Sequence, residues 1–174
     1  MEIATLGGGC FWCLEAVFAR LNGVEKVTSG YSGGHTPDPT YQQICTGKTG
    51  HAEAIQIVFS PERLSFKELL EIFFVLHDPT TLNRQGADVG TQYRSVIFYH
   101  TELQKEMACQ VMRETEGTLS GKIVTEVTPL VPFYPAEEYH QQYYELNPNA
   151  GYCRAIIVPK INKLHERFYE KIRK

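Results

Sequence analysis

The chain has 174 residues, of which 43% are hydrophobic and 21% charged, which excludes a disordered or fibrous protein and fits one domain over residues 1–174. The formal net charge of −3 gives no reason to expect nucleic acid or a membrane as a partner. With no apolar run long enough for a bilayer and no leader-like N-terminus, we expect a cytoplasmic protein, a monomer by default, whose five cysteines stay reduced.

The N-terminal part of the sequence alternates predicted strands and helices. Residues 3–6 predict a short strand that ends at three glycines, and apolar residues at helical spacing predict a helix from Cys10 to Arg20. Val24–Tyr31 is predicted to be a strand. The Gly- and Pro-rich stretch Ser32–Pro39 is predicted to be a loop.

The middle part repeats this alternation. Residues 51–59 predict a strand, and a capping-box pattern then starts a strongly amphipathic helix that ends at Asp78-Pro79. Residues 80–92 look irregular and polar, and Tyr93–Tyr99 is rich in residues that favour strands.

The C-terminal part is predicted to hold a helix over Thr101–Thr115, an irregular stretch over 128–153 and an amphipathic helix over 160–173. This last helix carries most of the only basic cluster, which acidic residues interrupt and which we interpret as a solvated helix face. The basic residues are Lys160, Lys163, Arg167, Lys171, Arg173 and Lys174.

The order of elements up to Tyr99 is strand, helix, strand, strand, helix, strand. This is the order of a split βαβ unit. We therefore predict an α+β fold, a ferredoxin-like two-layer sandwich with a mostly antiparallel sheet, helices on one face and an irregular C-terminal extension.

Cys10 is the first candidate for chemistry, because it follows three glycines and opens a predicted helix. Unpaired N–H groups at a helix start favour a thiolate, so we expect the pKa of Cys10 to be lowered. Cys13 follows one helical turn later, at a spacing that allows a disulfide. Two alternatives are that both cysteines only pack in the core, or that they form half of a zinc site; no second CxxC supports the latter, and we expect no metal.

Glu53 is the second candidate. In the predicted strand 51–59 the odd positions share one face, and Glu53 therefore lies in register with Ile55, Ile57 and Phe59. A carboxyl group on a buried face has a raised pKa and can act as a general acid near neutral pH. The alternative is a salt bridge at the rim of the sheet.

Aromatic residues form the third group. Phe11 and Trp12 flank Cys10 and would line an apolar pocket, although core packing is the usual role of a single aromatic residue. Tyr31, Tyr41 and Tyr93 lie near Gly- or Pro-rich loops, where their hydroxyl groups could hold a polar oxygen of a substrate. The dispersed histidines are expected to be mostly surface or helix-end residues. Cys45 and Cys109 are expected to be structural.

Taken together, these segments resemble A-type peptide methionine sulfoxide reductases over roughly residues 5–155. The matching segments occur in the family's order, and together they are highly specific. They are Gly9-Cys10-Phe11-Trp12, Gly30-Tyr31-Ser32-Gly33-Gly34, Pro39-Thr40-Tyr41, Gly50-His51-Ala52-Glu53, His77-Asp78-Pro79, Arg84-Gln85-Gly86, Gly90-Thr91-Gln92-Tyr93-Arg94-Ser95, Pro132-Phe133 and His140-Gln141-Gln142-Tyr143.

The resemblance implies reduction of methionine S-sulfoxide, free or within proteins, with thioredoxin as reductant and no cofactor. It implies that Cys10 attacks the sulfoxide sulfur, that Glu53 protonates the oxygen, and that Tyr41 and Tyr93 hydrogen-bond that oxygen. Two further matches concern substrate binding. These are Phe11 and Trp12 around the S-methyl group, and Asp88 near the substrate backbone.

The resemblance also implies that a second cysteine condenses with the sulfenic acid formed on Cys10. Both Cys13 and Cys153 qualify. We favour Cys153 slightly, because a mobile C-terminal loop could reach Cys10 without unwinding the helix. The alternative functions are a general thiol–disulfide oxidoreductase using Cys10 and Cys13, and a zinc- or redox-responsive binding module.

Overall fold

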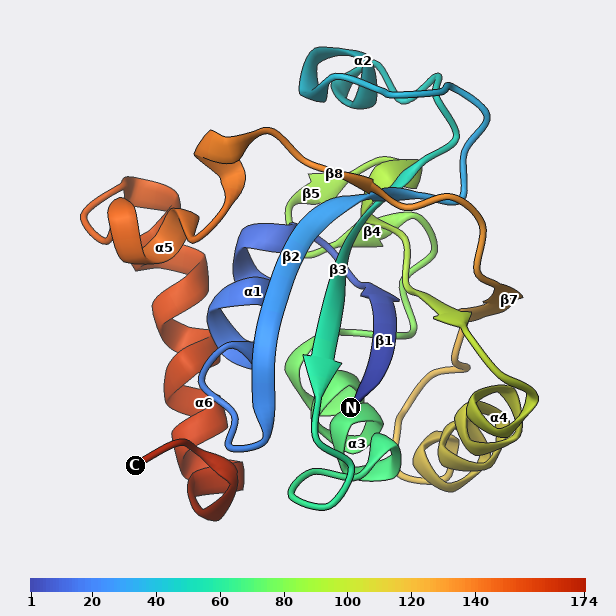
Figure 1. Ribbon diagram of the computed structural model, residues 1–174, viewed down its shortest axis with the longest axis vertical. Helices are drawn as coiled ribbons and strands as arrows, with labels where there is room; N and C mark the ends of the chain where they lie inside the picture. Colours follow the sequence, from blue (N-terminus) through green and yellow to red (C-terminus); the bar gives the residue numbers. More distant parts are fainter.

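A six-stranded sheet forms the centre of the molecule, and the computed structural model describes all of residues 1–174 (Figure 1). The strands lie in the order β7-β6-β1-β3-β2-β8. A separate two-stranded ribbon pairs β4 with β5. The bounds are β1 Glu2–Gly7, β2 Val24–Ser32, β3 Ala52–Phe59, β4 Arg84–Gln85, β5 Asp88–Val89, β6 Val96–Tyr99, β7 Glu126–Pro129 and β8 Tyr134–Pro135.

The sheet is mostly antiparallel, as predicted. Strand β1 runs antiparallel to both β3 and β6, and β2 runs antiparallel to β3. The exception is the edge strand β7, which pairs in parallel with β6 and was not predicted. The fold is therefore a mixed α/β structure in which β1 and β3 occupy the centre of the sheet.

One predicted strand begins later than expected. Tyr93 belongs to a 3-10 turn, Thr91–Tyr93, and β6 starts only at Val96. Gly90 sets up the turn with φ 147°, and its carbonyl oxygen accepts a hydrogen bond from the Tyr93 N–H at 3.0 Å. The turn moves Tyr93 out of the sheet, so the strand-forming residue types around it were misleading.

The helices follow the predicted positions with two additions, the short helix α2 just after the Gly- and Pro-rich loop and the short helix α5 within the stretch predicted to be irregular. Helix α3 begins with the predicted capping box between Ser65 and Glu68, and α2 begins with the same device between Thr40 and Gln43. The bounds are α1 Phe11–Phe18, α2 Tyr41–Cys45, α3 Phe66–Leu76, α4 Glu102–Glu116, α5 Tyr143–Leu146 and α6 Val158–Phe168.

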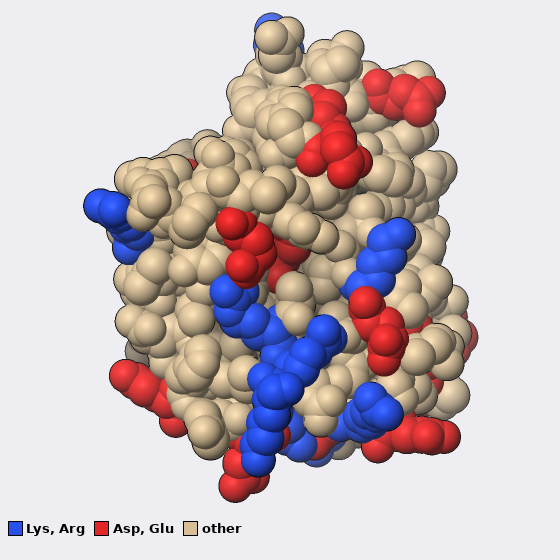
Figure 2. Space-filling model, turned by 60° about the vertical axis from the view of Figure 1, so that its left-hand side comes forward, with Lys and Arg blue, Asp and Glu red and all other residues tan.

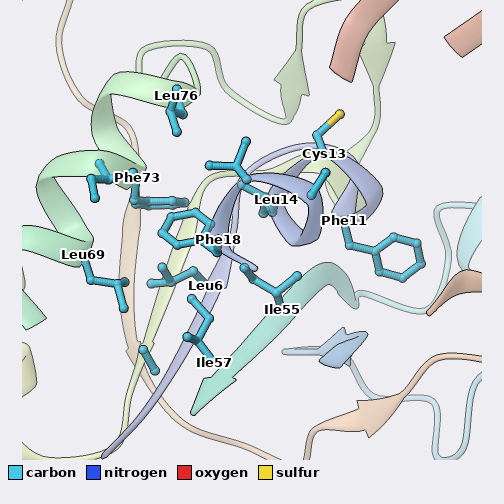
Figure 3. Close-up of a cluster of buried hydrophobic side chains, with 14 of the residues drawn as sticks. Leu6, Phe11, Cys13, Leu14, Phe18, Ile55, Ile57, Leu69, Phe73 and Leu76 are labelled. Carbon is cyan, nitrogen blue, oxygen red and sulfur yellow. The ribbon is translucent and has the colours of Figure 1, made fainter. Parts of the chain in front are cut away.

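The main core lies between one face of the sheet and helices α1 and α3 (Figure 3). Leu14 and Phe18 of α1 point toward Phe73 of α3, while Ile55 and Ile57 approach from the sheet. Phe18 is fully buried, so truncating it to Ala would cost about 3–5 kcal/mol of stability. This packing fixes α1, and with it the cysteines at its start, against the central strands.

The C-terminal segment is less regular than the rest. Within the stretch predicted to be irregular lie only short elements, including α5 and a 3-10 turn at Glu138–His140. Cys153 opens a π-helical turn, Cys153–Ile157, which continues directly into α6. In length and apolar character, none of the helices reaches what a membrane crossing requires.

Candidate active site

A turn at Gly9 places Cys10 at the start of helix α1. Gly9 adopts φ +90°, and a Cβ there would approach the Gln85 side chain to 2.7 Å, so only glycine fits this position. The Gly9 N–H donates to the Tyr93 carbonyl oxygen at 3.2 Å, which ties the turn to the Thr91–Tyr93 segment. Cys10 follows as the N-cap of α1 and is only 8% exposed.

The side chain of Glu53 lies beside the start of helix α1. It occupies β3 on the core side, as its strand pattern predicted, and is 2% exposed. Its Oε1 accepts the Phe11 backbone N–H at 3.1 Å, a bond that by itself favours the carboxylate. Burial outweighs that bond and raises the pKa of Glu53 to about 8, and the nearby Asp88 charge adds to the rise. Glu53 is therefore mostly protonated at neutral pH.

The expectation that the helix start lowers the pKa of Cys10 was wrong. Burial raises the pKa of the Cys10 thiol, and its hydrogen bond with Cys13 and the Glu53 charge raise it further. It is Cys13 that has a lowered pKa: hydrogen bonding with Cys10 lowers it to about 7, although burial acts in the opposite direction. The two thiols of the pair thus differ: the pKa of Cys10 is raised and that of Cys13 is lowered.

Two tyrosines face Glu53 from separate segments. Tyr41 is the first residue of α2 and Tyr93 ends the Thr91–Tyr93 turn. Burial raises the pKa of both phenols, and the Glu53 charge is the second cause in each case. Both hydroxyl groups therefore stay protonated and remain hydrogen-bond donors near the carboxyl group.

Aromatic rings form one wall beside Cys10. Trp12 stacks on Tyr143 with ring centroids 3.7 Å apart, and its Nε1–H donates to His140 Nδ1 at 3.0 Å. The His140 ring also lies 5.1 Å from Phe11 and 4.4 Å from Tyr41. The C-terminal segment therefore holds Phe11 and Trp12 in place through His140 and Tyr143.

On the other side of Cys10 lies a cavity of about 310 Å³, whose lining includes Asp88, Tyr152 and Lys160. The Tyr152 hydroxyl lies 2.8 Å from Asp88 Oδ2 and 3.6 Å from Cys13 Sγ. The hydroxyl group donates to Asp88, whereas in the longer contact with Cys13 either the phenol or the thiol can be the donor. Asp88 is thus part of the site through Tyr152.

Cys153 is buried in the first turn of the π-helical stretch, and burial raises the pKa of its thiol. The prediction of an irregular loop at this position was wrong, since Cys153 belongs to a continuous helical segment that packs against α1. The reason for favouring Cys153 over Cys13 as the resolving cysteine is therefore lost. All five cysteines are free thiols in this structure.

Sequence reasoning missed Glu137. Its Oε1 accepts the Tyr31 hydroxyl and its Oε2 accepts the Tyr41 backbone N–H, both at 2.9 Å, so it fixes the start of α2. Nothing in the local pattern around Glu137 indicates this role, because both partners lie about 100 residues earlier in the chain.

The histidines were expected to be mostly surface or helix-end residues, and His77 does end α3, but three of the six are buried. His51, His77 and His140 are buried, and each makes side-chain hydrogen bonds. All three lie in segments that resemble family motifs, which was the signal that the sequence offered. Among the other cysteines, Cys45 is exposed and Cys109 is half-buried. No three His, Cys, Asp or Glu side chains are grouped as metal ligands would be.

Comparison with known proteins gives a match along nearly the whole chain. Residues 2–172 match the family model of peptide methionine sulfoxide reductase. A peptide methionine sulfoxide reductase MsrA of Saccharolobus solfataricus is 54% identical over 173 residues, which cover 99% of this chain and 98% of the relative.

Solved structures agree with the sequence match. Methionine sulfoxide reductase A of Corynebacterium diphtheriae is 38% identical, with a TM-score of 0.82 over 86% of this chain and 76% of that one. Mxr1 of Saccharomyces cerevisiae in complex with Trx2 is 26% identical, with a TM-score of 0.58 over 82% of this chain and 84% of that one.

Proposed function

The chain belongs to the peptide methionine sulfoxide reductase family and reduces methionine sulfoxide, and from that premise we propose that it acts on the S epimer through Cys10 and Glu53. One observation carries this assignment. A buried carboxyl group with a pKa of about 8 shares the start of α1 with the Cys10 thiol. A sulfoxide sulfur is a poor electrophile until its oxygen receives a proton, and Glu53 holds such a proton at neutral pH.

In the proposed first step the Cys10 sulfur attacks the sulfoxide sulfur while Glu53 protonates the sulfoxide oxygen. In the resulting adduct the oxygen passes to the Cys10 sulfur: the substrate S–O bond and the newly formed S–S bond both break, which leaves methionine and a sulfenic acid on Cys10. The proton of the Cys10 thiol returns to Glu53, so the balance is one thiol and one sulfoxide in, one sulfenic acid and one methionine out. Tyr41 and Tyr93 donate hydrogen bonds to the oxygen during the transfer.

Substrate binding is proposed to involve Phe11, Trp12 and Asp88. The Trp12 ring, held by Tyr143 and His140, offers an apolar surface for the S-methyl group. Asp88 lies in the cavity that Cys10 also lines and would accept a hydrogen bond from the substrate backbone.

The second proposed step forms a disulfide with loss of water. The thiolate of a second cysteine attacks the Cys10 sulfenic sulfur, and hydroxide leaves as water after taking a proton. Cys13 is the better candidate, because it lies in the first turn of α1 next to its N-cap Cys10 and because hydrogen bonding lowers the pKa of its thiol, whereas burial raises the pKa of Cys153. Cys153 remains the alternative, in parallel or in relay.

Thioredoxin is the proposed reductant of this disulfide. The support is the structure of the related Mxr1 in complex with Trx2, together with a disulfide step that requires an external dithiol. We further propose that residues 1–174 act as a single catalytic domain, that the protein is a monomer, and that it works in the cytoplasm, where thiols are kept reduced.

We also propose that the four strands β6-β1-β3-β2 and helices α1 and α3 form a ferredoxin-like core. Its support is the strand order together with antiparallel pairing at each of the three junctions. In a split βαβ unit the helix connects two parallel strands with a third strand between them, which matches β1, α1 and β2 around β3.

The most direct test supplies each epimer of methionine sulfoxide with dithiothreitol. We expect turnover of the S epimer and none of the R epimer. Failure to reduce the S epimer, in folded protein with free thiols, would contradict the proposed specificity. Mapping the disulfide formed in one turnover without reductant then identifies the resolving cysteine.

A further inference from the structure

Five of the six basic residues near the C-terminus form no salt bridge. Lys171 pairs with Glu68, and Arg173 donates to the Val24 carbonyl oxygen. Lys160, Lys163 and Arg167 form no salt bridge, and their spacing along α6 puts them on one side of that helix. Figure 2, which turns the α6 side of the molecule forward, shows Lys and Arg side chains gathered in a connected strip on its lower half.

These three residues line a groove of about 720 Å³ between α6, the end of α3 and the segment after α4. The only carboxylate in the lining is Asp78, which already accepts two hydrogen bonds from Thr80. His77 is neutral there, because burial lowers its pKa to about 4. The remaining polar lining consists of hydroxyl groups and Gln85, so the groove is net positive.

The groove adjoins the cavity beside Cys10. Gln85, Pro159 and Lys160 line both spaces. The positive charge of Lys160 acts on the cysteine pair Cys10 and Cys13, since it helps to lower the pKa of Cys13. Along α6, Arg167 lies about 10 Å beyond Lys160, a distance that an extended peptide covers in about three residues.

We propose that this basic groove binds acidic side chains that flank the methionine sulfoxide in an oxidised protein, at about two to four residues from the oxidised position. This inference rests on the proposed function of Cys10. A protein substrate whose sulfoxide reaches Cys10 must extend away from that cavity, and the groove offers a cationic path from it. The enzyme should therefore prefer methionine sulfoxide in acidic segments.

The test compares two peptides that each contain one methionine S-sulfoxide. One carries Glu at the second and fourth positions on either side, and the other carries Gln at those positions. With dithiothreitol as reductant at low salt, we expect kcat/KM to be about three- to tenfold higher for the acidic peptide, because exposed charge pairs are worth little individually. The preference should shrink above about 0.5 M salt.

The ratio of the two kcat/KM values should fall to near one in Lys163→Gln/Arg167→Gln, and the charge reversal Lys163→Glu/Arg167→Glu should favour a matching Lys-containing peptide. The matched control is Lys26→Gln/Lys105→Gln, which removes the same charge from exposed residues outside the groove and should keep the wild-type ratio. The ratio is insensitive to any general loss of active protein.

Three outcomes would overturn the inference. These are equal rates for both peptides in the wild type, an unchanged ratio in both groove variants, and a groove substitution that raises only the KM for thioredoxin. The last result would mean that the groove binds thioredoxin and not the oxidised substrate. Failure of the wild type to reduce free methionine S-sulfoxide would instead refute the proposed function of Cys10, which separates the two ideas.

Discussion

The two regions that meet at Cys10 are built in different ways. The first is the N-terminal corner, formed by β1, the start of α1 and β3, which supplies Cys10, Cys13 and Glu53. These positions are fixed by the pairing of the central strands β1 and β3 and by the packing of α1 in the core. The second is the C-terminal segment, residues 133–168, which reaches the site with single side chains from short elements.

This difference suggests that the two regions have different roles in the reaction. The corner holds the groups that exchange protons and form bonds, where a small displacement is costly. The C-terminal segment supplies ring contacts and hydrogen bonds around them, such as His140 to Trp12 and Tyr152 to Cys13. Substitutions in the corner should therefore have steep effects and those in the C-terminal segment shallow ones. The following predictions test that contrast.

The largest effect is expected for Cys10→Ser. Removing the attacking sulfur should lower S-sulfoxide turnover by at least about a thousandfold, because a serine hydroxyl is a far weaker nucleophile and cannot accept the oxygen as a sulfenic acid. The measurement is methionine released per enzyme with dithiothreitol. Retention of a tenth of wild-type activity would place the reacting group elsewhere.

Glu53→Gln should lower the rate of reduction by about a hundred- to ten-thousandfold, since it removes the general acid. In the wild type the rate of the reduction step should fall as the pH rises through about 8, where Glu53 loses its proton. Single-turnover kinetics against pH would show both effects. An unchanged rate in the variant would remove Glu53 from the mechanism.

The same substitution should increase stability at alkaline pH, which separates a functional from a structural role. A glutamate in the unfolded chain ionises near pH 4.3, whereas folded Glu53 ionises at about 8. Between these values unfolding releases a proton, so the free energy of unfolding falls as the pH rises. Glu53→Gln abolishes this fall, which amounts to at most about 5 kcal/mol. Urea unfolding at pH 5 and pH 9 would measure it.

Cys13→Ala should slow disulfide formation by about tenfold or more while leaving the first reduction of sulfoxide measurable. The reason is that Cys13 has the lower pKa of the two candidate resolving thiols. Mass mapping after one turnover without reductant should find a Cys10–Cys13 disulfide in the wild type. A Cys10–Cys153 disulfide as the main product would contradict this order.

The extent to which the sequence predicts this site depends on how local each signal is. Strand alternation placed Glu53 on the buried face, and glycines followed by a helix pattern placed Cys10 at a helix start. The same local view gave the wrong pKa direction for Cys10, because burial and the Cys13 contact arise only after α1 packs. Glu137 and the parallel strand β7 depend on contacts across the fold, which no local pattern carries.

Tyr152→Phe tests the C-terminal region directly. Loss of the hydroxyl removes a hydrogen bond that lowers the pKa of Cys13, so that pKa should rise and disulfide formation at pH 7 should slow by about two- to fivefold. The pH dependence of Cys13 alkylation, measured in a Cys10→Ser background, reports the shift. Tyr143→Phe is the control, because Tyr143 stacks on Trp12 without bonding to Cys13. Equal shifts in both variants would argue against a specific hydrogen bond.

The smallest effect is expected for Cys153→Ala, the counterpart of Cys13→Ala in the other region. Cys153 is buried in a continuous helical segment, and reaching Cys10 would require that turn to unwind, so thioredoxin-dependent turnover should stay within about twofold of the wild type. The double variant Cys13→Ala/Cys153→Ala shows whether any resolution remains. If Cys153→Ala alone stops turnover with thioredoxin but not the first reduction, the C-terminal region opens during the cycle. The contrast between a reacting corner and a merely supporting segment would then fail.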